Sequence, residues 1–375
     1  MAKKDAKINL LDHSEAKVGL YGRYLSIFLN ILSRSPINTI HLFDLFCGEG
    51  VFEDGGKGSP IVALETIRNH FFNNNKTCPN INIVFNDTGF SEIEPTKLKT
   101  DRVKENASKI FKPKNVNVGY VNIDYSVLIE KVINRTDKLR SNERALVFID
   151  PWGYKEIDPN DIKKLLSNGK TEVILFLPIY FMARFVEKSR DDEFKGGKAI
   201  RKFIELLFGS IDNYPKSKSQ KEFIYKIQEQ FKVFLNLKYV DTFKIERESN
   251  NWFCLFFFTN NKKGFQKMIE AKWLIDKKHG TEFKIGEDLK MDLFDEIEVS
   301  NYTEKVSSFL KNNLAATNID LMNFGLENNF LPPHTKKVLD EIKLNHGIDI
   351  ISLDGLPARS YYLGDEKRLV NIKIR

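Results

Sequence analysis

Residues 38–70, NTIHLFDLFCGEGVFEDGGKGSPIVALETIRNH, predict a strand, a glycine turn and a helix in succession. The apolar run Ile40–Phe43 is rich in strand-forming residues and leads into Asp44. A glycine turn, CGEG, follows. The Ser59–Pro60 pair then supplies a helix cap and a proline suited to the first helical position. Because glycine lets the backbone approach a ligand closely, this unit predicts a nucleotide or nucleoside pocket with the Asp44 carboxylate beside it.

The spacing of the glycines distinguishes this turn from two familiar phosphate-binding loops. It is not G-x-G-x-x-G, and no Gly-Lys-Ser/Thr follows, so neither a dinucleotide site nor a P-loop is favoured. The pattern D-x-F-x-G-x-G resembles the first motif of class I S-adenosylmethionine (SAM)-dependent methyltransferases. A tight strand-to-helix turn in another α/β protein would explain the same pattern without a ligand. The resemblance implies a set of residues that hold the methionine end of SAM: Asp44, Phe46, Gly48, Glu49 and Gly50.

Acidic residues end or follow the next two expected strands. A second buried strand, Ile81–Asp87, ends in Asp87, the candidate for holding ribose hydroxyls, with Asn86 as its substitute. A polar strand end that faces solvent is the alternative. A third strand near Val116–Asn122 is followed by Asp124. In the methyltransferase interpretation Asp124 accepts a hydrogen bond from the adenine amino group; capping of an exposed helix is its alternative role.

A fully apolar strand, Ala145–Ile149, ends in Asp-Pro-Trp-Gly at 150–153. This resembles the D/N-P-P-Y/F/W motif of methyltransferases that act on amino nitrogens, with tryptophan replacing the second proline and glycine replacing the aromatic residue. The Asp150 carboxylate can accept hydrogens of an exocyclic amine, Pro151 fixes the turn, and Trp152 can stack on a planar substrate. We therefore predict these three residues as catalytic. A common D-P-x-G turn without catalytic function is the alternative.

Two further residues are candidates for contact with the substrate. Tyr154 follows the turn, and it is open whether its ring or that of Trp152 stacks on the acceptor. Arg184 lies in what we expect to be a loop after a fifth strand that begins at Glu172. An insertion at about 185–235 follows, and in this fold such an insertion often carries the substrate surface.

These patterns together predict an α/β fold, a Rossmann-like class I methyltransferase sheet with flanking helices, over residues 1–280. It includes an amphipathic N-terminal helix at 14–34 and an antiparallel strand pair near its end. Residues 281–300 form an acidic linker. Residues 301–375 predict three helices and a two-stranded wing at 347–364, the order of a winged-helix domain. The third helix carries lysines and acids together, so DNA binding and protein docking both remain open.

The composition permits some partners and disfavours others. The 375 residues carry a net charge of +7, spread along the chain, so a nucleic-acid partner is permitted but not required. The cysteines Cys47, Cys78 and Cys254 are far apart, which disfavours a disulfide framework or zinc site and fits a reducing cytoplasm. We expect no metal, because no D-x-D or H-x-x-x-H cluster occurs. We also expect no membrane partner, because no apolar segment is long enough to span a bilayer.

Nearly the whole chain resembles one family, the three-Cys-motif partner (TcmP) proteins. The resemblance is carried by FDLFCGEG and the following GSP, by VFND, VFIDPWG and WFCLFFFTNN, and by the C-terminal segment NFGLENNFLPPHTKKVLDEI. It implies a class I methyltransferase fold with a winged-helix tail, encoded in bacteria beside a three-Cys-motif protein that resembles radical-SAM enzymes. That neighbour is the expected protein partner, and no iron–sulfur cluster is implied for this chain.

The leading hypothesis is a cytoplasmic methyltransferase that uses SAM as its cofactor and acts on an amine, such as the amino group of a nucleic-acid base. The main alternative is a non-catalytic subunit that keeps the methyltransferase fold and docks protein or DNA through its winged helix. A nuclease or phosphotransfer enzyme that uses its acids to bind a metal is a third interpretation, and it ranks last.

Overall fold

The structure, a computed structural model, describes residues 9–73, 78–186, 197–247, 251–284, 300–313 and 316–375. The chain divides into two compact units, Met1–Ala271 with Glu282–Glu287 and Lys272–Thr281 with Asp288–Arg375. The first unit contains the large sheet, and the second contains three helices and a small sheet. No helix within the described ranges is both long enough and apolar enough to cross a membrane.

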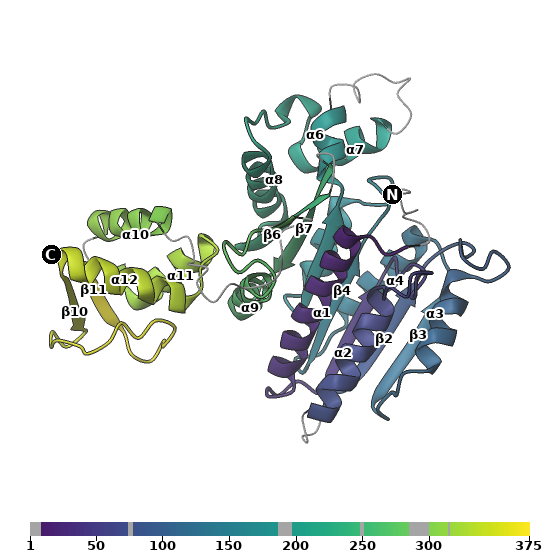
Figure 1. The fold of residues 1–375 in the computed structure, drawn as a ribbon, viewed down its shortest axis with the longest axis horizontal. Coiled ribbons are helices and arrows are strands. Elements are labelled where there is room, and N and C mark those ends of the chain that lie inside the picture. The colour runs from purple at the N-terminus through teal and green to yellow at the C-terminus, as the bar shows by residue number, and fades with distance from the viewer. Residues whose placement is uncertain (1–8, 74–77, 187–196, 248–250, 285–299, 314–315) are drawn as a thin grey trace. The chain divides into compact units, whose positions relative to one another are not determined.

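An eight-stranded sheet forms the centre of the first unit, in the order β3-β2-β1-β4-β5-β7-β6-β8 (Figure 1). The strands are β1 (Thr39–Asp44), β2 (Asn80–Asn86), β3 (Val116–Val121), β4 (Glu143–Ile149), β5 (Thr171–Leu177), β6 (Tyr239–Arg247), β7 (Asn251–Thr259) and β8 (Glu282–Lys284). Strands β1 to β5 are parallel, β7 runs antiparallel between β5 and β6, and β8 pairs parallel with β6. The predicted α/β class with a large, mainly parallel central sheet is therefore confirmed.

The central strands are buried on both faces, which explains why their sequences are nearly continuous apolar runs. All seven residues of β5 are buried, and β4 is buried except at Arg144. In the register of the sheet, Asp44 of β1 lies opposite Phe85 of β2 on one side and Phe148 of β4 on the other. The carboxyl ends of these strands therefore meet at one edge of the sheet.

Helices cover both faces of this sheet. One face carries α1 (Asp12–Leu32), α2 (Ser59–Asn73) and α3 (Lys99–Ser108), which lie side by side in Figure 1. Apolar side chains of α4 (Tyr125–Asp137), α5 (Pro159–Leu166), α7 (Gly197–Phe208) and α8 (Gln220–Leu235) form a common core with the sheet. The remaining helices of this unit are α6 (Ile179–Phe185), the short 3-10 helix η2 (Ile211–Asn213) and α9 (Lys262–Trp273).

Local sequence explains where two of these helices begin and end. The Asp158 side chain accepts a hydrogen bond from the Asn160 backbone and caps α5, while Pro159 takes the first helical position. Ser219 caps α8 in the same way, and Asn236 ends that helix in the left-handed conformation at a φ of 52°. Short polar side chains thus mark the start of both helices and the end of α8.

The N-terminal helix expected at 14–34 is α1, which packs directly on the sheet. The Tyr21 ring stacks on Phe148 of β4 with ring centroids 4.5 Å apart, and the Tyr24 ring lies 4.8 Å from that of Phe257 in β7. Both tyrosines are almost completely buried. Helix α1 is therefore part of the core of this unit, and its side chains can reach the ends of β4 and β5.

Two expectations about the first unit need correction. Arg184 lies in a helix, α6, and not in a loop, because Pro178 acts as its N-cap residue and the helix buries Ile179 and Met182. The predicted acidic linker begins with strand β8, which the ion pair between Lys244 and Glu282 helps to hold against β6. Residues 285–299 of that linker lie outside the described residues, as do residues 187–196 of the predicted insertion.

The second unit contains three helices and three short strands. Its elements are α10 (Ser300–Asn312), β9 (Ala316–Thr317), α11 (Asn318–Glu327), α12 (Pro332–His346), β10 (Ile348–Ser352) and β11 (Val370–Ile374). The strands form an antiparallel sheet in the order β10-β11-β9. Thr317 and Asp320 form a capping box that starts α11. The partner strand of β10 is β11, beyond the expected 347–364, because Val370 and Ile372 supply its buried apolar positions.

Candidate active site

Three acids predicted from the sequence lie where parallel strands end at one edge of the sheet. Asp44 is the last residue of β1, Asp87 follows β2, and Asp150 follows β4. In open α/β sheets, ligands bind outside these carboxyl ends, at the point where the strand order reverses. That point lies between β1 and β4 in this sheet, so Asp44 and Asp150 flank it.

The glycine turn after β1 has the backbone conformation that its glycines allow. Gly48 and Gly50 have φ values of 64° and 75°, which other residues rarely adopt. A Cβ atom on Gly50 would approach the Val103 side chain to 3.0 Å, because α3 packs closely there. A Cβ atom on Gly48 would have no described atom within 4 Å. Open space therefore adjoins the backbone at Gly48, as a ligand-binding turn requires.

The Asp44 carboxylate is completely buried and only half satisfied. The Ser59 hydroxyl at the start of α2 donates to Asp44 Oδ2 at 2.6 Å, whereas Oδ1 has no hydrogen-bond partner among the described residues. Burial raises the pKa of Asp44 to about 7; the Ser59 hydrogen bond opposes this rise, and Asp150 adds to it. The Phe46 backbone N–H also lowers the pKa of Asp44, but it does not form a hydrogen bond with Oδ1. A cationic ligand could donate a hydrogen bond to this unpaired oxygen, Asp44 Oδ1.

Asp87 holds the glycine turn in place. Its Oδ2 accepts a hydrogen bond from the Gly48 backbone at 2.8 Å, and its Oδ1 pairs with Lys99 Nζ of α3 at 3.2 Å. Burial raises the pKa of Asp87, and the nearby Lys99 ammonium opposes that rise. Asn86 is not available as a substitute, because its side-chain amide ties Leu45 O to the Ile123 backbone. The sequence had not indicated Lys99, which comes from a helix twelve residues further on.

Glu49 has partners within the protein on both carboxylate oxygens, and its contact with the methionine end of SAM stays a prediction. The Glu49 side chain is buried and accepts hydrogen bonds from the Glu92 backbone and from Arg102 NH1, both at 2.7 Å. Arg102 also pairs with Glu94 at 2.9 Å. Glu49 therefore anchors the segment that leads into α3, and both of its oxygens are occupied by protein donors.

Phe46 and Asp124 are both placed at the start of α4. The Phe46 ring stacks on Tyr125 with centroids 5.1 Å apart. Asp124 is the N-cap residue of α4: its Oδ1 accepts hydrogen bonds from the Ser126 backbone and hydroxyl, which lower its pKa. The helix-capping role that the sequence left open for Asp124 is thus present, and contact with adenine stays a prediction.

Asp150 is paired with a residue that the sequence did not connect to it. Lys17 of α1 forms an ion pair with Asp150 Oδ2, and its Nζ lies 4.6 Å from the centre of the Phe176 ring at the end of β5. The side chains of Lys17 and Asp150 are only 11% and 19% exposed. Helical periodicity places Lys17 off the apolar face of α1, and no local pattern indicates a partner 133 residues away.

The structure separates the two aromatic residues that the sequence left as alternatives. Tyr154 is 5% exposed, donates its hydroxyl to the Pro178 carbonyl at 3.1 Å and packs on Phe203 of α7. Trp152 is 75% exposed. Only Trp152 therefore has a ring face free to meet a substrate. Arg184 is exposed on α6, where it contacts Asn251 at 3.2 Å and the Tyr180 ring.

The acids at this edge are held by protein donors. Ser59 donates to Asp44, while Asp87 and Asp150 each pair with a lysine. In the part of the chain that the structure describes, no group of three or more His, Cys, Asp or Glu side chains is arranged to hold a metal ion. Each of the three acids therefore has at least one hydrogen-bond or ion-pair partner within the protein.

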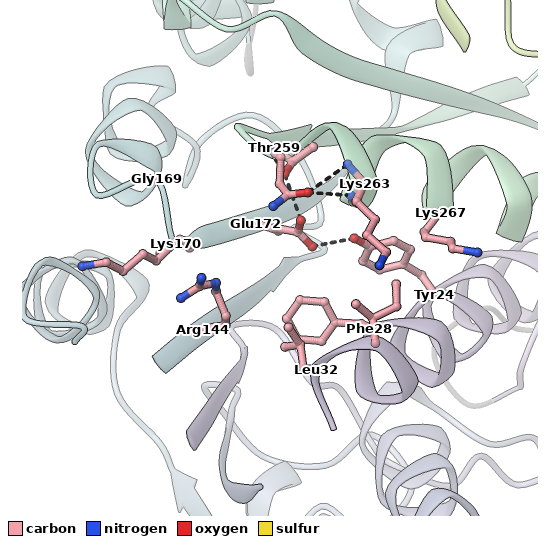
Figure 2. Close-up of a pocket in the computed structure, with 14 residues that line it drawn as sticks. Tyr24, Phe28, Leu32, Arg144, Gly169, Lys170, Glu172, Thr259, Lys263 and Lys267 are labelled. Carbon is pink, nitrogen blue, oxygen red and sulfur yellow. Dashed lines mark hydrogen bonds between the residues drawn. The ribbon is translucent and has the colours of Figure 1, made fainter. Parts of the chain in front are cut away.

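A separate cavity of about 90 Å³ lies at the opposite edge of the sheet (Figure 2). Glu172, near the start of β5, forms part of its wall and accepts hydrogen bonds from the Tyr24 hydroxyl at 2.5 Å and the Thr259 hydroxyl at 2.9 Å. Burial raises the pKa of Glu172 to about 6. Gly264 of α9 packs against this carboxylate so closely that a Cβ there would lie 2.1 Å from Oε1. These contacts tie α1 and α9 to the sheet.

Comparisons with known proteins give only distant structural matches. No protein-family model and no curated protein sequence matches the chain. An O-methyltransferase from Bacillus cereus in complex with SAH matches 69% of this chain and 93% of its own, with 12% identity and a TM-score of 0.33. An O-methyltransferase of tomaymycin synthesis from Streptomyces achromogenes, in complex with SAM, matches 64% and 79%, with 13% identity and a TM-score of 0.30.

A tRNA methyltransferase from B. subtilis that modifies m1A22 matches 84% of this chain and 94% of its own, with 10% identity and a TM-score of 0.24. At such identities and scores these matches carry no argument about activity. The resemblance to the three-Cys-motif partner family likewise stays a prediction.

Proposed function

We propose that this protein is a SAM-dependent methyltransferase that transfers the methyl group to an amine nitrogen. The amino group of a nucleic-acid base is one acceptor of this class. One observation carries the proposal: the buried Asp44 carboxylate, whose Oδ1 has no donor in the described structure. A buried carboxylate is costly unless it is paired. An ammonium group such as that of the methionine end of SAM would pair with it.

The other residues of the turn suit the same ligand. The open backbone at Gly48 gives room for the methionine end, and Asp87 and Asp124 are the candidates for contact with the ribose and the adenine. The five parallel strands β1 to β5 fit the Rossmann-like sheet that the sequence predicted for a class I methyltransferase. The turn carries neither G-x-G-x-x-G nor Gly-Lys-Ser/Thr, which favours SAM over a phosphate-bearing cofactor.

Bound SAM supplies a methyl group on a positively charged sulfur, which is a good leaving group. The task of the protein is then to place an acceptor nitrogen in line with that methyl and to leave its lone pair exposed. Asp150 Oδ1, which has no partner among the described residues, can accept a hydrogen from such a nitrogen. Pro151 fixes the turn, and the exposed Trp152 ring offers a stacking surface.

Calorimetric titration with SAM and with SAH, its demethylated form, tests the proposal. We expect micromolar binding by the intact protein and at least a hundredfold loss in Asp44→Ala, because an ammonium would lose a buried partner. Asp101→Asn, which changes an exposed acid on α3, is the matched control and should bind normally. Absence of binding by the intact protein would contradict the proposal.

A second candidate function concerns the second unit. Its order of helix, strand, helix, helix and two strands is compatible with a winged helix, and Lys336, Lys337 and Lys343 are exposed on α12. Leu353 and Leu356, between β10 and β11, are also exposed. We propose a docking role for this unit, toward protein or DNA, with the three-Cys-motif protein as the expected protein partner. If the intact protein binds duplex DNA and Lys336→Glu/Lys337→Glu does not, DNA is the favoured partner of this unit. If the intact protein does not bind DNA, or if the double variant binds it equally well, a protein partner is favoured.

A further inference from the structure

The acceptor side of the site contains a cation supplied by the protein itself. Lys17 Nζ contacts Oδ2 of Asp150, the residue whose carboxylate was expected to receive a substrate amine. The ammonium also lies 4.6 Å from the centroid of the Phe176 ring, so an aromatic face supports it from a second direction. Both members of the pair are mostly buried. The position that a protonated amine would take at Asp150 is thus already filled.

This pair changes what Asp150 can attract. A free carboxylate at the end of β4 would favour any cation, including the ammonium of an alkyl amine. Paired with Lys17, the carboxylate is locally neutralised, and a second ammonium beside it would meet the repulsion of the first. Asp150 Oδ1 remains without a partner among the described residues and can still accept one hydrogen from an uncharged N–H.

Aromatic rings surround the same end of β5. The Phe176 ring stacks on Phe253 with centroids 5.3 Å apart, and Tyr180 of α6 lies edge-on to Phe253 at 5.4 Å. Phe181 in α6 and Trp152 in the turn that follows Asp150 both have exposed side chains. Such surroundings favour a flat, apolar ligand over a flexible charged one.

We propose that Lys17 determines acceptor specificity: it admits an uncharged, planar aromatic amine at Asp150 and excludes alkylammonium groups. This rests on the proposed methyl transfer at Asp150. An aromatic amine needs no proton removed before it reacts. Its nitrogen forms the bond to the methyl carbon as the carbon–sulfur bond breaks, sulfur keeps the electron pair, and the nitrogen then releases a proton to water. An alkylammonium would first need a base, and Asp150 is engaged by Lys17.

A matched pair of small amines tests the proposal by binding alone. Aniline and cyclohexylamine have the same six-carbon ring and one amino group, but at pH 7.5 aniline is neutral and flat while cyclohexylamine is protonated. Saturation-transfer NMR with the full chain saturated with SAH measures both affinities. We expect the intact protein to bind aniline at least tenfold more tightly than cyclohexylamine.

The variants separate a role in specificity from a structural role. Lys17→Gln should gain at least tenfold in cyclohexylamine affinity, because Asp150 is then an unpaired carboxylate. Lys17→Arg should keep the preference of the intact protein. The double variant Lys17→Gln/Asp150→Asn should lose the gained affinity again. Thermal unfolding of each variant, measured alongside, shows whether the fold is kept.

Two results would overturn this inference. One is that folded Lys17→Gln prefers aniline over cyclohexylamine as strongly as the intact protein does. The other is that the intact protein and Lys17→Gln both bind the two amines equally, or that both bind neither amine. Failure to bind SAH at all would instead overturn the proposed methyltransferase function. The calorimetric titration with SAH therefore comes first and distinguishes the two failures.

Discussion

Two buried carboxyl groups, Asp44 and Glu172, lie at opposite edges of the same sheet, and their surroundings differ in one respect. Both oxygens of Glu172 accept hydrogen bonds from buried hydroxyls, those of Tyr24 and Thr259. Asp44 has one such bond, from Ser59, and an oxygen with no donor among the described residues. Burial raises the pKa of both groups, to about 6 for Glu172 and about 7 for Asp44.

The difference indicates which acid serves the fold and which serves a ligand. A buried carboxyl group with every oxygen satisfied costs little and can tie elements together. A buried carboxyl group with one oxygen that lacks a donor destabilises the folded protein, and a bound ligand that supplies the donor removes this destabilisation. A cavity lies beside Glu172, yet the carboxyl group that lacks a donor, and that we propose as the ligand-binding one, is Asp44. Variants of the two acids can test this distinction in opposite directions.

The largest expected effect is on stability, at Glu172. Glu172→Ala leaves the Tyr24 and Thr259 hydroxyls buried without an acceptor and opens a void, so we expect a loss of about 3 kcal/mol in the free energy of unfolding. Urea denaturation measures it. SAH affinity should stay within about twofold of the intact protein, since the cavity is at the other edge of the sheet. A large loss of SAH affinity in folded Glu172→Ala would contradict the assignment of Glu172 to the fold and of Asp44 to the ligand.

Asp44 should behave in the opposite way. Its pKa is raised in the folded state, so between about pH 4 and pH 7 the folded protein holds a proton that the unfolded chain has lost. Stability therefore falls as the pH rises through this window. We expect Asp44→Asn to be about 2 kcal/mol more stable than the intact protein at pH 8.5 and nearly equal at pH 5.

Denaturation of both proteins at the two pH values measures the Asp44 effect. Asp101→Asn on the exposed face of α3 should show no such difference. Asp44→Asn that is less stable at pH 8.5 would mean that the Asp44 carboxylate already has a satisfying partner in the free protein.

A third expectation concerns protons released on binding. If an ammonium pairs with ionised Asp44, ligand binding must expel the proton that Asp44 carries below about pH 7. SAH affinity should then fall up to tenfold for each pH unit below 7, an effect of about 1.4 kcal/mol per unit. Calorimetry in buffers of different ionisation enthalpy counts the released protons. The residual binding of Asp44→Asn should lack this dependence on pH.

The smallest expected effect is at Tyr24. Tyr24→Phe removes one of the two hydrogen bonds to Glu172 but leaves the hydroxyl of Thr259 in place. We expect a loss of about 1 kcal/mol in unfolding free energy and no change in SAH affinity. Thr259→Val is the matched variant on the other oxygen. Equal stability of the intact protein and both variants would show that the Glu172 hydrogen bonds do not hold α1 to the sheet.

The fold could be predicted largely from the sequence because its signals are local. The runs at β1, β4 and β5 are apolar enough to be buried on both faces, and Asp44 and Asp150 were placed at strand ends by those runs alone. Contacts between distant segments could not be predicted. The sequence around Glu49 does not indicate Arg102, and nothing near Asp150 indicates Lys17.

The placement of Arg184 and the choice between Tyr154 and Trp152 also depend on tertiary packing, which the local sequence does not reveal. Arg184 was expected in a loop because Pro178 interrupts an apolar run, but proline is also suited to the start of a helix. Tyr154 and Trp152 are two residues apart and of similar character, so only the packing of Tyr154 on Phe203 separates core from surface. The pattern reveals which residue types are present at a site, and tertiary packing decides which of them face a ligand.

The exposure of Trp152 also makes it a natural optical probe. The chain has three tryptophans, and the other two, Trp252 and Trp273, are 5% and 7% exposed. Long-wavelength fluorescence and quenching by iodide should therefore come mainly from the turn after β4. A flat molecule that stacks there would dim this emission without any added dye. Compound collections can thus be screened against the intact protein by its intrinsic tryptophan fluorescence, before any acceptor is known.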